Sequence, residues 1–317
     1  MISTIFFGST DEVLHQMFKD LKNNKEIMYK QGVMTFKYKI NYFLFRICFS
    51  KFINTYIKIP FKKRWFPYFI KSSEEIALNS TFIFTKDNIK YLEFGYGEYL
   101  RNEFPKCKIV LLFLDIHALR NFNFKSINNL YDIAYTFDKV EAEKYGISYY
   151  PLCYSRSILE TKEKDFDICF IGQDKGRIEK IYKLYTNAIS LGLKVKIIVC
   201  GKCARKREYS NTEIEFVDSI PYKKVLEIIS KAKFNLEICL TDTASISIRL
   251  YEAIMFNQGL ITNNLAIMNS PYYNSSFVHI LDFDNIDLSF IKDFELKENT
   301  ILKEKISPLT FIDYLKN

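Results

Sequence analysis

The clearest structural signal in this 317-residue chain is the segment Asp167-Ile-Cys-Phe-Ile-Gly-Gln-Asp-Lys-Gly-Arg177. Its first six residues are mostly apolar and end in glycine, which is typical of a buried strand followed by a turn. Residues 173–177 form a polar loop, and apolar positions then recur at helical spacing over residues 178–191, up to a stop at Gly192. The segment therefore predicts a strand, a loop and a helix in succession, which is the unit that builds a parallel sheet.

Both halves of the chain repeat this unit. In the second half, further strands are predicted at 194–200, 213–217, 234–240 and 260–262, and helices at 221–229 and 246–255. In the first half, strands are predicted at 3–7, 81–84, 108–114 and 131–136, and helices at 11–22, 91–104 and 137–145. The fold class is therefore α/β, with two Rossmann-like parallel-sheet domains that bind ligands at the carboxyl ends of their strands.

The charged segment 160–164 is the predicted linker between the two halves. We expect an N-terminal domain over residues 1–155, with an insertion at 27–73, and a C-terminal domain over residues 156–300. Each is long enough to bury a core of its own. The last segment, residues 301–317, contains a short predicted helix.

The charge of the chain is concentrated in one segment. Hydrophobic residues make up 48% of the chain and charged residues 26%, which excludes wholesale disorder. The net charge of +8 comes from 45 basic and 37 acidic residues, and residues 27–73 hold ten Lys or Arg and no Asp or Glu, so the remainder has 35 basic and 37 acidic residues. The segment is also aromatic, and steps of three and four predict one helical face that contains Tyr38, Tyr42, Phe45, Phe49, Phe52 and Tyr56.

Three interpretations of segment 27–73 stay open. It could be an ordinary core helix with solvated lysines. It could lie on an anionic membrane, with the aromatic side chains in the headgroup region and the cations near the lipid phosphates. It could also bind nucleic acid by stacking and phosphate contact, although no recognised nucleic-acid-binding module is evident, so we expect no nucleic-acid partner.

The chain shows no targeting or disulfide pattern. No basic residues precede the apolar run at residues 2–8, and no apolar run has the length of a spanning helix. The seven cysteines are scattered and odd in number, and Cys200 and Cys203 have the spacing of half a zinc site without a second pair. We expect Cys200 to end a buried strand, and we expect the protein to be cytoplasmic.

Residues 172–177 have features of an anion-binding loop. The glycine pattern of dinucleotide-binding proteins and the P-loop are both absent from the chain. Gly172 and Gly176 nevertheless free the loop backbone, Lys175 and Arg177 supply positive charge, and the following helix offers unpaired N–H groups at its N-terminus. The alternative is a plain turn with solvated charges.

A second polar turn lies between the strand at 234–240 and the next helix. Its hydroxyl groups, at Thr241, Thr243 and Ser245, suit the cap and first turn of a helix. Arg249 and Glu252 are three residues apart and so share a helix face. They could neutralise a diphosphate and accept from a ribose hydroxyl respectively, or they could form an intrahelical salt bridge.

These residues resemble the C-terminal, nucleotide-sugar-binding domain of GT-B glycosyltransferases, in particular bacterial enzymes of capsule, lipopolysaccharide and exopolysaccharide assembly. The resemblance extends over about residues 80–290, and its matching segments are Asp167–Arg177, Ile246–Ala253 with Leu260–Asn264, and Tyr135–Lys139 with Lys144–Gly146 and Tyr150-Pro151. Many retaining members carry a second acid seven residues before the position of Glu252, where this chain has Ser245, so inversion and retention both stay open.

The resemblance implies two facing domains, a central cleft and a nucleotide-diphosphate sugar bound to the second half. UDP is expected as the commonest nucleotide of such enzymes, and no metal or other cofactor is implied. Donor-binding residues would be Gly172, Lys175, Gly176, Arg177, Ser245, Arg249 and Glu252. Residues 301–317 would return to the first domain.

An inverting reaction would need a proton acceptor in the first half. Asp115, which ends a predicted buried strand, is the first candidate and His117 the second. Asp11 and His15 could come from the same edge of the sheet, and each of the four could instead be a cap or a surface group. Asp138 is expected to cap its own turn.

The implied function is transfer of a hexosyl or related sugar to a glycan, carried on a lipid diphosphate, at the inner face of the cytoplasmic membrane. Segment 27–73 would contact the anionic membrane surface. A non-catalytic GT-B-like scaffold or partner subunit is the alternative. A metal-dependent GT-A enzyme is disfavoured, because the Asp-x-Asp at 165–167 begins a predicted strand and the one at 282–284 comes late in the chain.

Overall fold

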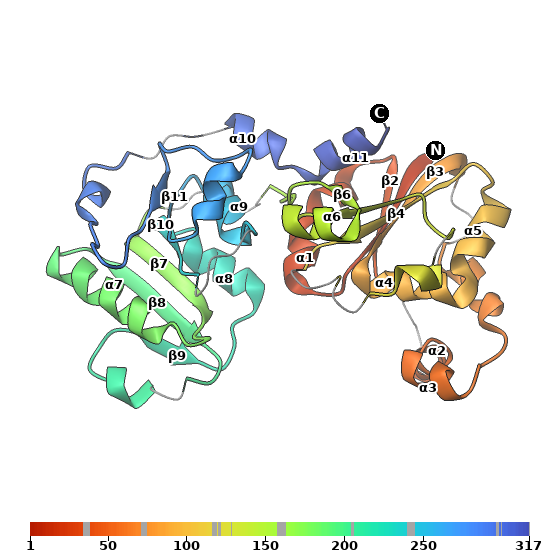
Figure 1. The fold of residues 1–317 in the computed structure, drawn as a ribbon, viewed down its shortest axis with the longest axis horizontal. Helices are drawn as coiled ribbons and strands as arrows, with labels where there is room; N and C mark the ends of the chain where they lie inside the picture. The colour runs from red at the N-terminus through yellow and green to blue at the C-terminus, as the bar shows by residue number, and fades with distance from the viewer. Residues whose placement is uncertain are drawn as a thin grey trace. The chain divides into compact units, whose positions relative to one another are not determined.

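A computed structural model of the chain describes residues 1–33, 39–70, 75–115, 119, 122–127, 129–156, 163–203, 206–239, 245–295, 298 and 300–316. Its contacts divide the chain into two units. Unit 1 contains Met1–Cys153 and the residues from Phe311 onward, and unit 2 contains Tyr154–Thr310. Figure 1 shows that each unit is a twisted sheet with helices packed against it.

The sheet of unit 2 has six parallel strands in the order β12-β11-β10-β7-β8-β9. Their bounds are β7 Phe166–Gln173, β8 Val195–Cys200, β9 Glu215–Val217, β10 Ala232–Glu237, β11 Gly259–Thr262 and β12 Val278–Ile280. The helices of the repeating units are α7 Ile178–Ser190, α8 Tyr222–Ile229 and α9 Ile248–Met255. The chain forms β7, β8 and β9 in one direction and then returns to place β10 on the other side of β7.

The two faces of this sheet are buried by different helices. Along β7, Ile168 and Phe170 pack into a cluster with the apolar face of α7, whereas Cys169 and Ile171 pack into a second cluster with α8. Successive side chains of a strand point to opposite faces, so a run of apolar residues is the pattern of a strand covered on both sides. For this reason the apolar run at residues 167–172 predicts strand β7 correctly.

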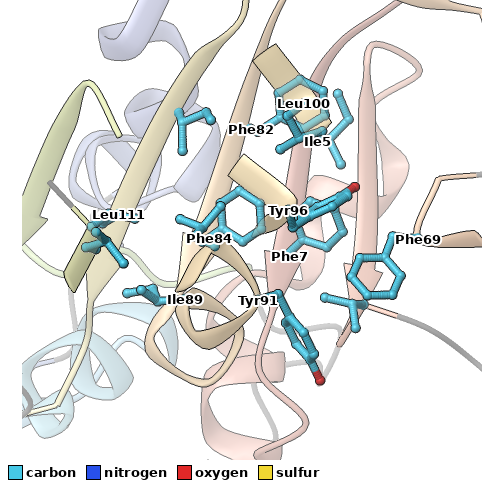
Figure 2. Close-up of a cluster of buried hydrophobic side chains, with 14 of the residues drawn as sticks. Ile5, Phe7, Phe69, Phe82, Phe84, Ile89, Tyr91, Tyr96, Leu100 and Leu111 are labelled. Carbon is cyan, nitrogen blue, oxygen red and sulfur yellow. The ribbon is translucent and has the colours of Figure 1, made fainter. Parts of the chain in front are cut away.

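The sheet of unit 1 also has six parallel strands, in the order β2-β1-β3-β4-β5-β6. Their bounds are β1 Ile2–Gly8, β2 Ile27–Gln31, β3 Ile76–Thr85, β4 Lys108–Phe113, β5 Ile133–Thr136 and β6 Ser148–Tyr149. The α-helices are α1 Glu12–Met17, α2 Lys39–Cys48, α3 Lys51–Tyr56, α4 Lys86–Tyr91, α5 Gly97–Glu103 and α6 Lys139–Tyr145. Figure 2 shows the aromatic core of this unit, where Phe7 and Phe84 meet Tyr96 between the sheet and its helices.

The last two helices are α10 Thr300–Lys305 and α11 Pro308–Lys316. Phe311 of α11 lies in unit 1, where its ring contacts Tyr150 and Tyr135 at centroid distances of 4.7 and 5.5 Å. The Lys108 side chain donates a hydrogen bond to the carbonyl of Leu315. These contacts attach α11 to β5, β4 and the end of β6.

Three features differ from the sequence-based predictions. Edge strands β2, β6 and β12 are not predicted. The helix predicted at 91–104 begins earlier, at Lys86, and is interrupted at Gly95, whose φ of +96° lies outside the helical region. The aromatic helix of the basic segment is divided into α2 and α3, because Ser50 caps a new helix by accepting from the backbone N–H of Ile53.

A tight contact in unit 2 yields a stability prediction. Gly259 lies opposite Phe234 in neighbouring strands, and the Phe234 ring occupies the space that a Cβ at position 259 would need. Gly259→Ala is therefore expected to lower the free energy of unfolding by about 1–3 kcal/mol in a urea titration. Gly146→Ala is the comparison, because a Cβ there meets nothing within 4 Å and the cost is limited to its left-handed backbone. Equal stability of Gly259→Ala and the wild type would contradict the packing described here.

Candidate functional site

A pocket of about 430 Å³ lies at the carboxyl ends of β7 and β10. These two strands flank the point where the strand order of unit 2 reverses, which is where open α/β sheets bind ligands. We call it the donor pocket. Its lining includes Lys175 and Arg177, which follow β7, and Arg249 at the start of α9. The structure thus brings the three predicted cations to one pocket.

The loop after β7 is built as a tight turn. The backbone N–H of Arg177 donates to the carbonyl of Asp174, and the Asp174 side chain accepts from the N–H of Ile178 at 2.9 Å, which caps α7. Gly176 has a φ of +84°, a conformation that glycine adopts without strain, and Lys175 has a φ of +48°. The turn leaves Lys175 exposed and places Arg177 beside the strand end.

The guanidinium of Arg177 is held at the strand ends. It donates to the carbonyls of Gln173 and Ile238, and it stacks on the Phe170 ring with the guanidinium carbon 5.1 Å from the ring centroid. Gly172 leaves room for this group, because a Cβ at position 172 would lie 3.1 Å from Arg177 Nη2. Within the described part of the chain, Arg177 makes no ion pair. Burial and the neighbouring charge of Arg249 lower the pKa of the Arg177 guanidinium, which means that they destabilise its charged form. A bound anion would stabilise that charged form.

Arg249 is paired within its own helix. Its Nη1 atom lies 2.6 Å from Glu252 Oε2, and its Nη2 atom donates to the carbonyl of Ile171. Burial alone would lower the pKa of the Arg249 guanidinium, but the Glu252 carboxylate outweighs that effect and raises it. The predicted intrahelical salt bridge is therefore present, and one edge of its arginine lines the donor pocket.

Glu252 does not face the pocket, which differs from the expectation that it holds a ribose. The side chain is fully buried. Its Oε1 atom accepts from the Tyr222 hydroxyl at 2.8 Å, and its Oε2 atom accepts from Asn235 at 3.1 Å as well as from Arg249. The hydroxyl of Tyr154 lies 2.9 Å from that of Tyr222 and extends the network. In this arrangement Glu252 positions Arg249.

The start of α9 also differs in detail from its prediction. Ser245 is buried and its carbonyl accepts from Asn264, whereas the cap of α9 is Ser247, which accepts from the N–H of Arg249 and lines the donor pocket. Thr241 and Thr243 lie outside the described residues. Sequence reasoning missed Ser247 because several hydroxyl residues in succession fit the cap equally well.

Glu237, which sequence reasoning also missed, lines the donor pocket at the end of β10. Its Oε2 atom accepts from the Thr262 hydroxyl at 2.6 Å, and its buried Oε1 atom accepts no hydrogen bond from the described residues. A carboxylate oxygen without a donor is a candidate acceptor for a ligand hydroxyl. Its signal in the sequence was an acid near the carboxyl end of a predicted strand.

A second pocket, of about 360 Å³, occupies the corresponding place in unit 1, at the carboxyl ends of β1, β3 and β4. We call it the unit 1 pocket. The order of this sheet reverses between β1 and β3, so it too lies at a switch point. Its lining includes Asp115 and Asp11, as predicted for one sheet edge, together with Ser9 and Asp87, which were not predicted.

The carboxylates of the unit 1 pocket have different partners. Asp115 is exposed and lies 3.7 Å from the Lys86 ammonium. Asp11 caps α1 by accepting from two backbone N–H groups, which is the alternative role foreseen for it. Asp87 accepts from the Ser9 hydroxyl. Its signal in the sequence was an acid within three residues of the end of the strand predicted at 81–84.

The other candidates of unit 1 lie elsewhere. His117 is outside the described residues. His15 does not line the pocket; its ring nitrogens lie 3.2 Å from the Tyr29 hydroxyl and from the Lys22 ammonium, and burial lowers its pKa. Asp138 is buried and caps α6 by accepting from the N–H of Glu141, as predicted.

A larger cavity of about 630 Å³ lies on unit 2 against Ala253 and Leu302. Its described lining contains three acids, Asp293, Glu295 and Glu298, and no Lys or Arg. An acidic cavity repels a nucleotide phosphate, so the smaller donor pocket is the better candidate for nucleotide binding.

No protein-family model and no curated protein matches this chain. Solved structures do match it over both units. One is an alpha-glucosyltransferase in complex with UDP and a 13-mer DNA that contains an HMU base; it is 11% identical, the match covers 92% of this chain and 89% of that one, and the TM-score is 0.54. The chain has the GT-B fold.

A second solved structure agrees with this assignment of the fold. It is an alpha-glucosyltransferase in complex with UDP-glucose and DNA that contains an abasic site, 13% identical, with 95% of this chain and 91% of that chain covered and a TM-score of 0.51. At these identities the likeness shows the fold alone, because one fold can serve many functions. What this GT-B chain does has to be inferred from its pockets.

The GT-A alternative has no support in this GT-B chain. Asp165 and Asp167 lie at the beginning of β7, where they pair with Lys231 and Lys233 at 2.8 and 2.9 Å. Among the residues that the structure describes, no three His, Cys, Asp or Glu side chains are grouped as metal ligands. Cys200 ends β8, as predicted.

Proposed function

We propose that this protein is a glycosyltransferase that moves a sugar from a nucleotide-diphosphate sugar to a hydroxyl group of an acceptor. The observation that carries the proposal is the donor pocket. Arg177 there has no ion-pair partner in the described part of the chain, and Arg249 lies close enough to lower its pKa. Two neighbouring cations in a partly buried pocket favour a ligand with several negative charges, as a diphosphate has.

The side chains of the donor pocket suggest how the donor would be held. Arg177 and Arg249 would bind the diphosphate by charged hydrogen bonds, and Lys175 would add a mobile positive charge at the pocket mouth. The Oε1 atom of Glu237, which accepts no hydrogen bond from the described residues, would accept from a hydroxyl of the ribose or the sugar, the role first expected of Glu252. A UDP-sugar is the expected donor, and no metal ion is needed in this scheme.

In the proposed reaction, the acceptor oxygen bonds to the anomeric carbon while the bond from that carbon to the diphosphate oxygen breaks. The diphosphate leaves with the electron pair, and the arginines stabilise the charge that develops on it. Because the arginine side chains are already held in place, they can stabilise this charge without first having to be reoriented. We assign the proton acceptor to the unit 1 pocket, with Asp115 first and Asp87 as the alternative, because both are carboxylates at the ends of adjacent strands.

We further propose that the acceptor is a glycan carried on a lipid diphosphate, as in surface polysaccharide assembly at the inner face of the cytoplasmic membrane. The resemblance to capsule and lipopolysaccharide enzymes supports this acceptor. The alpha-glucosyltransferases of similar fold are in complex with DNA, so DNA is the competing acceptor in a transfer assay. The competing overall function is a non-catalytic scaffold with the same fold.

Thermal denaturation with nucleotides tests the proposal. UDP at about 100 times its dissociation constant should add about 2.7 kcal/mol to the free energy of unfolding and raise the melting temperature by several degrees. Uridine, which lacks the diphosphate, should have a much smaller effect at the same concentration, and EDTA should leave the UDP effect unchanged. If neither UDP, GDP and CMP nor the corresponding nucleotide sugars change the melting temperature, the protein is a non-catalytic scaffold and the transferase proposal is wrong.

A further inference from the structure

Helices α2 and α3 expose an unusual number of large apolar side chains. The set comprises Ile40, Tyr42, Phe43, Leu44, Phe52, Tyr56 and Ile57, and each is at least 48% exposed. We call this set the α2–α3 surface. Figure 1 shows both helices at the periphery of unit 1, away from its sheet. Single exposed apolar residues are normal in soluble proteins, but seven within residues 40–57 indicate a binding surface.

Other residues, in α2 and in the turn that follows it, anchor this segment to the unit. Phe45 and Phe49 are buried, and their rings contact Phe69 at centroid distances of 5.9 and 5.8 Å and Tyr91 at 5.8 and 5.2 Å. This inner pair belongs to the core of unit 1. The predicted aromatic face is thus divided between two roles, because Tyr42, Phe52 and Tyr56 of the same face are exposed. The apolar side chains of the α2–α3 surface are therefore not needed to hold the helices in place.

The same region is strongly cationic. Residues 39–70 contain seven Lys or Arg and no Asp or Glu. Six of the seven are exposed, and Arg46 and Arg64 lie over the rings of Tyr42 and Phe61. Of the seven, Lys51 is the one with an ion-pair partner among the described residues, Glu93 at 2.7 Å, so most of the positive charge of the region has no described counter-charge. The occupant of this surface must therefore be both apolar and anionic.

One occupant has both properties over a broad area. At an anionic bilayer, aromatic and aliphatic side chains enter the boundary between headgroups and acyl chains, and the surrounding Lys and Arg approach the lipid phosphates. A second copy of this chain would bring like charges together. A nucleic acid would satisfy the cations and leave the aliphatic side chains of the surface in water.

We propose that the α2–α3 surface docks unit 1 on an anionic lipid membrane, lying in the interface without crossing it. No helix in the described part of the chain is both long enough and apolar enough to cross a bilayer. The inference goes beyond the proposed transferase activity and does not rest on it, because the contacts that carry it lie outside both pockets.

Co-sedimentation with liposomes tests the docking. The full chain should bind vesicles of phosphatidylcholine with phosphatidylglycerol, and it should bind vesicles of phosphatidylcholine alone at least about tenfold more weakly. The triple variant Phe43→Ser, Phe52→Ser, Ile57→Ser should bind anionic vesicles about tenfold more weakly than the wild type. The double variant Lys58→Glu, Lys63→Glu should lose binding to anionic vesicles by a similar factor.

Controls separate docking from folding and from nucleotide binding. Ile301→Ser removes an exposed isoleucine from α10 and should bind vesicles like the wild type. Each variant should keep the circular dichroism spectrum of the wild type and the increase in melting temperature that UDP causes. If the proposed transferase function is wrong, UDP will not raise the melting temperature of the wild type, and the binding to vesicles will be unaffected. Equal binding to both kinds of vesicle, no binding to either, or unchanged binding by the triple variant would overturn the proposal. The proposal would also be overturned if the protein bound duplex DNA more tightly than anionic vesicles and the same substitutions abolished the binding to DNA.

Discussion

Replacement of Arg249 by methionine is expected to lower the free energy of unfolding by about 3–5 kcal/mol. The reason is Glu252, which is fully buried and has Arg249 as its charged partner at 2.6 Å. Tyr222 and Asn235 would still donate hydrogen bonds to this carboxylate, but neither carries a positive charge. Methionine fills much of the volume of the arginine, so the measured loss would report the uncompensated charge. Urea unfolding followed by circular dichroism measures it.

The double variant Arg249→Met, Glu252→Gln separates the stability of unit 2 from its binding of nucleotide. Glutamine can still accept from Tyr222, and it buries no charge, so the double variant should recover most of the stability lost in the single one. Its affinity for UDP should stay below that of the wild type, because the guanidinium that lines the donor pocket is absent. If the double variant is as unstable as Arg249→Met, the buried ion pair is not the cause of the loss.

The parallel sheets could be predicted from the sequence because their central strands are buried on both faces. Such strands are short apolar runs that end in glycine or polar residues, as in 167–172 and 108–114. Strands β6 and β12 have two and three residues, and β2 begins the basic segment, so none of the three has that pattern. All three are edge strands, with one neighbour each.

The site could be predicted only where it depends on residues close in sequence. The loop 172–177 and the pair Arg249 and Glu252 are local patterns, and the structure brings their cations together. The burial of Glu252 could not be predicted, because it depends on Tyr222 and Asn235, which lie on other elements. A spacing of three residues on a helix shows that two side chains can meet, and it does not show whether they meet in water or in the core.

The division of the aromatic segment between core and surface also depends on residues far away in the sequence. Steps of three and four between rings predicted a single helical face. The cap at Ser50 starts a second helix, and among the described rings of the predicted face Phe45 and Phe49 are the two that reach the ring of Phe69. Which rings of an amphipathic segment become core depends on the partners that long-range packing supplies. The sequence pattern alone therefore left the core and membrane interpretations equally open.

Replacement of Arg177 by alanine is expected to weaken UDP binding by about tenfold to 100-fold and to lower kcat by about 100-fold to 1000-fold. Arg177 lines the donor pocket and has no ion-pair partner among the described residues, so its charge is available to a diphosphate. The effect on kcat should exceed the effect on affinity, because negative charge on the leaving diphosphate grows as the bond to the sugar breaks. Isothermal titration with UDP and initial rates with the donor sugar measure the two quantities.

Two further variants show which property of Arg177 matters. Arg177→Lys keeps the charge but loses the planar fork that stacks on Phe170 and donates to two carbonyls, so its activity should lie between those of alanine and arginine. Arg156→Ala removes an exposed arginine of unit 2 that pairs with Glu304 at 3.5 Å, and it should bind UDP like the wild type. The loss in Arg177→Ala should be large for UDP and small for uridine, because uridine has no phosphate. Equal losses for both ligands would mean that Arg177 shapes the pocket through Phe170 and Ile238 and does not bind the diphosphate.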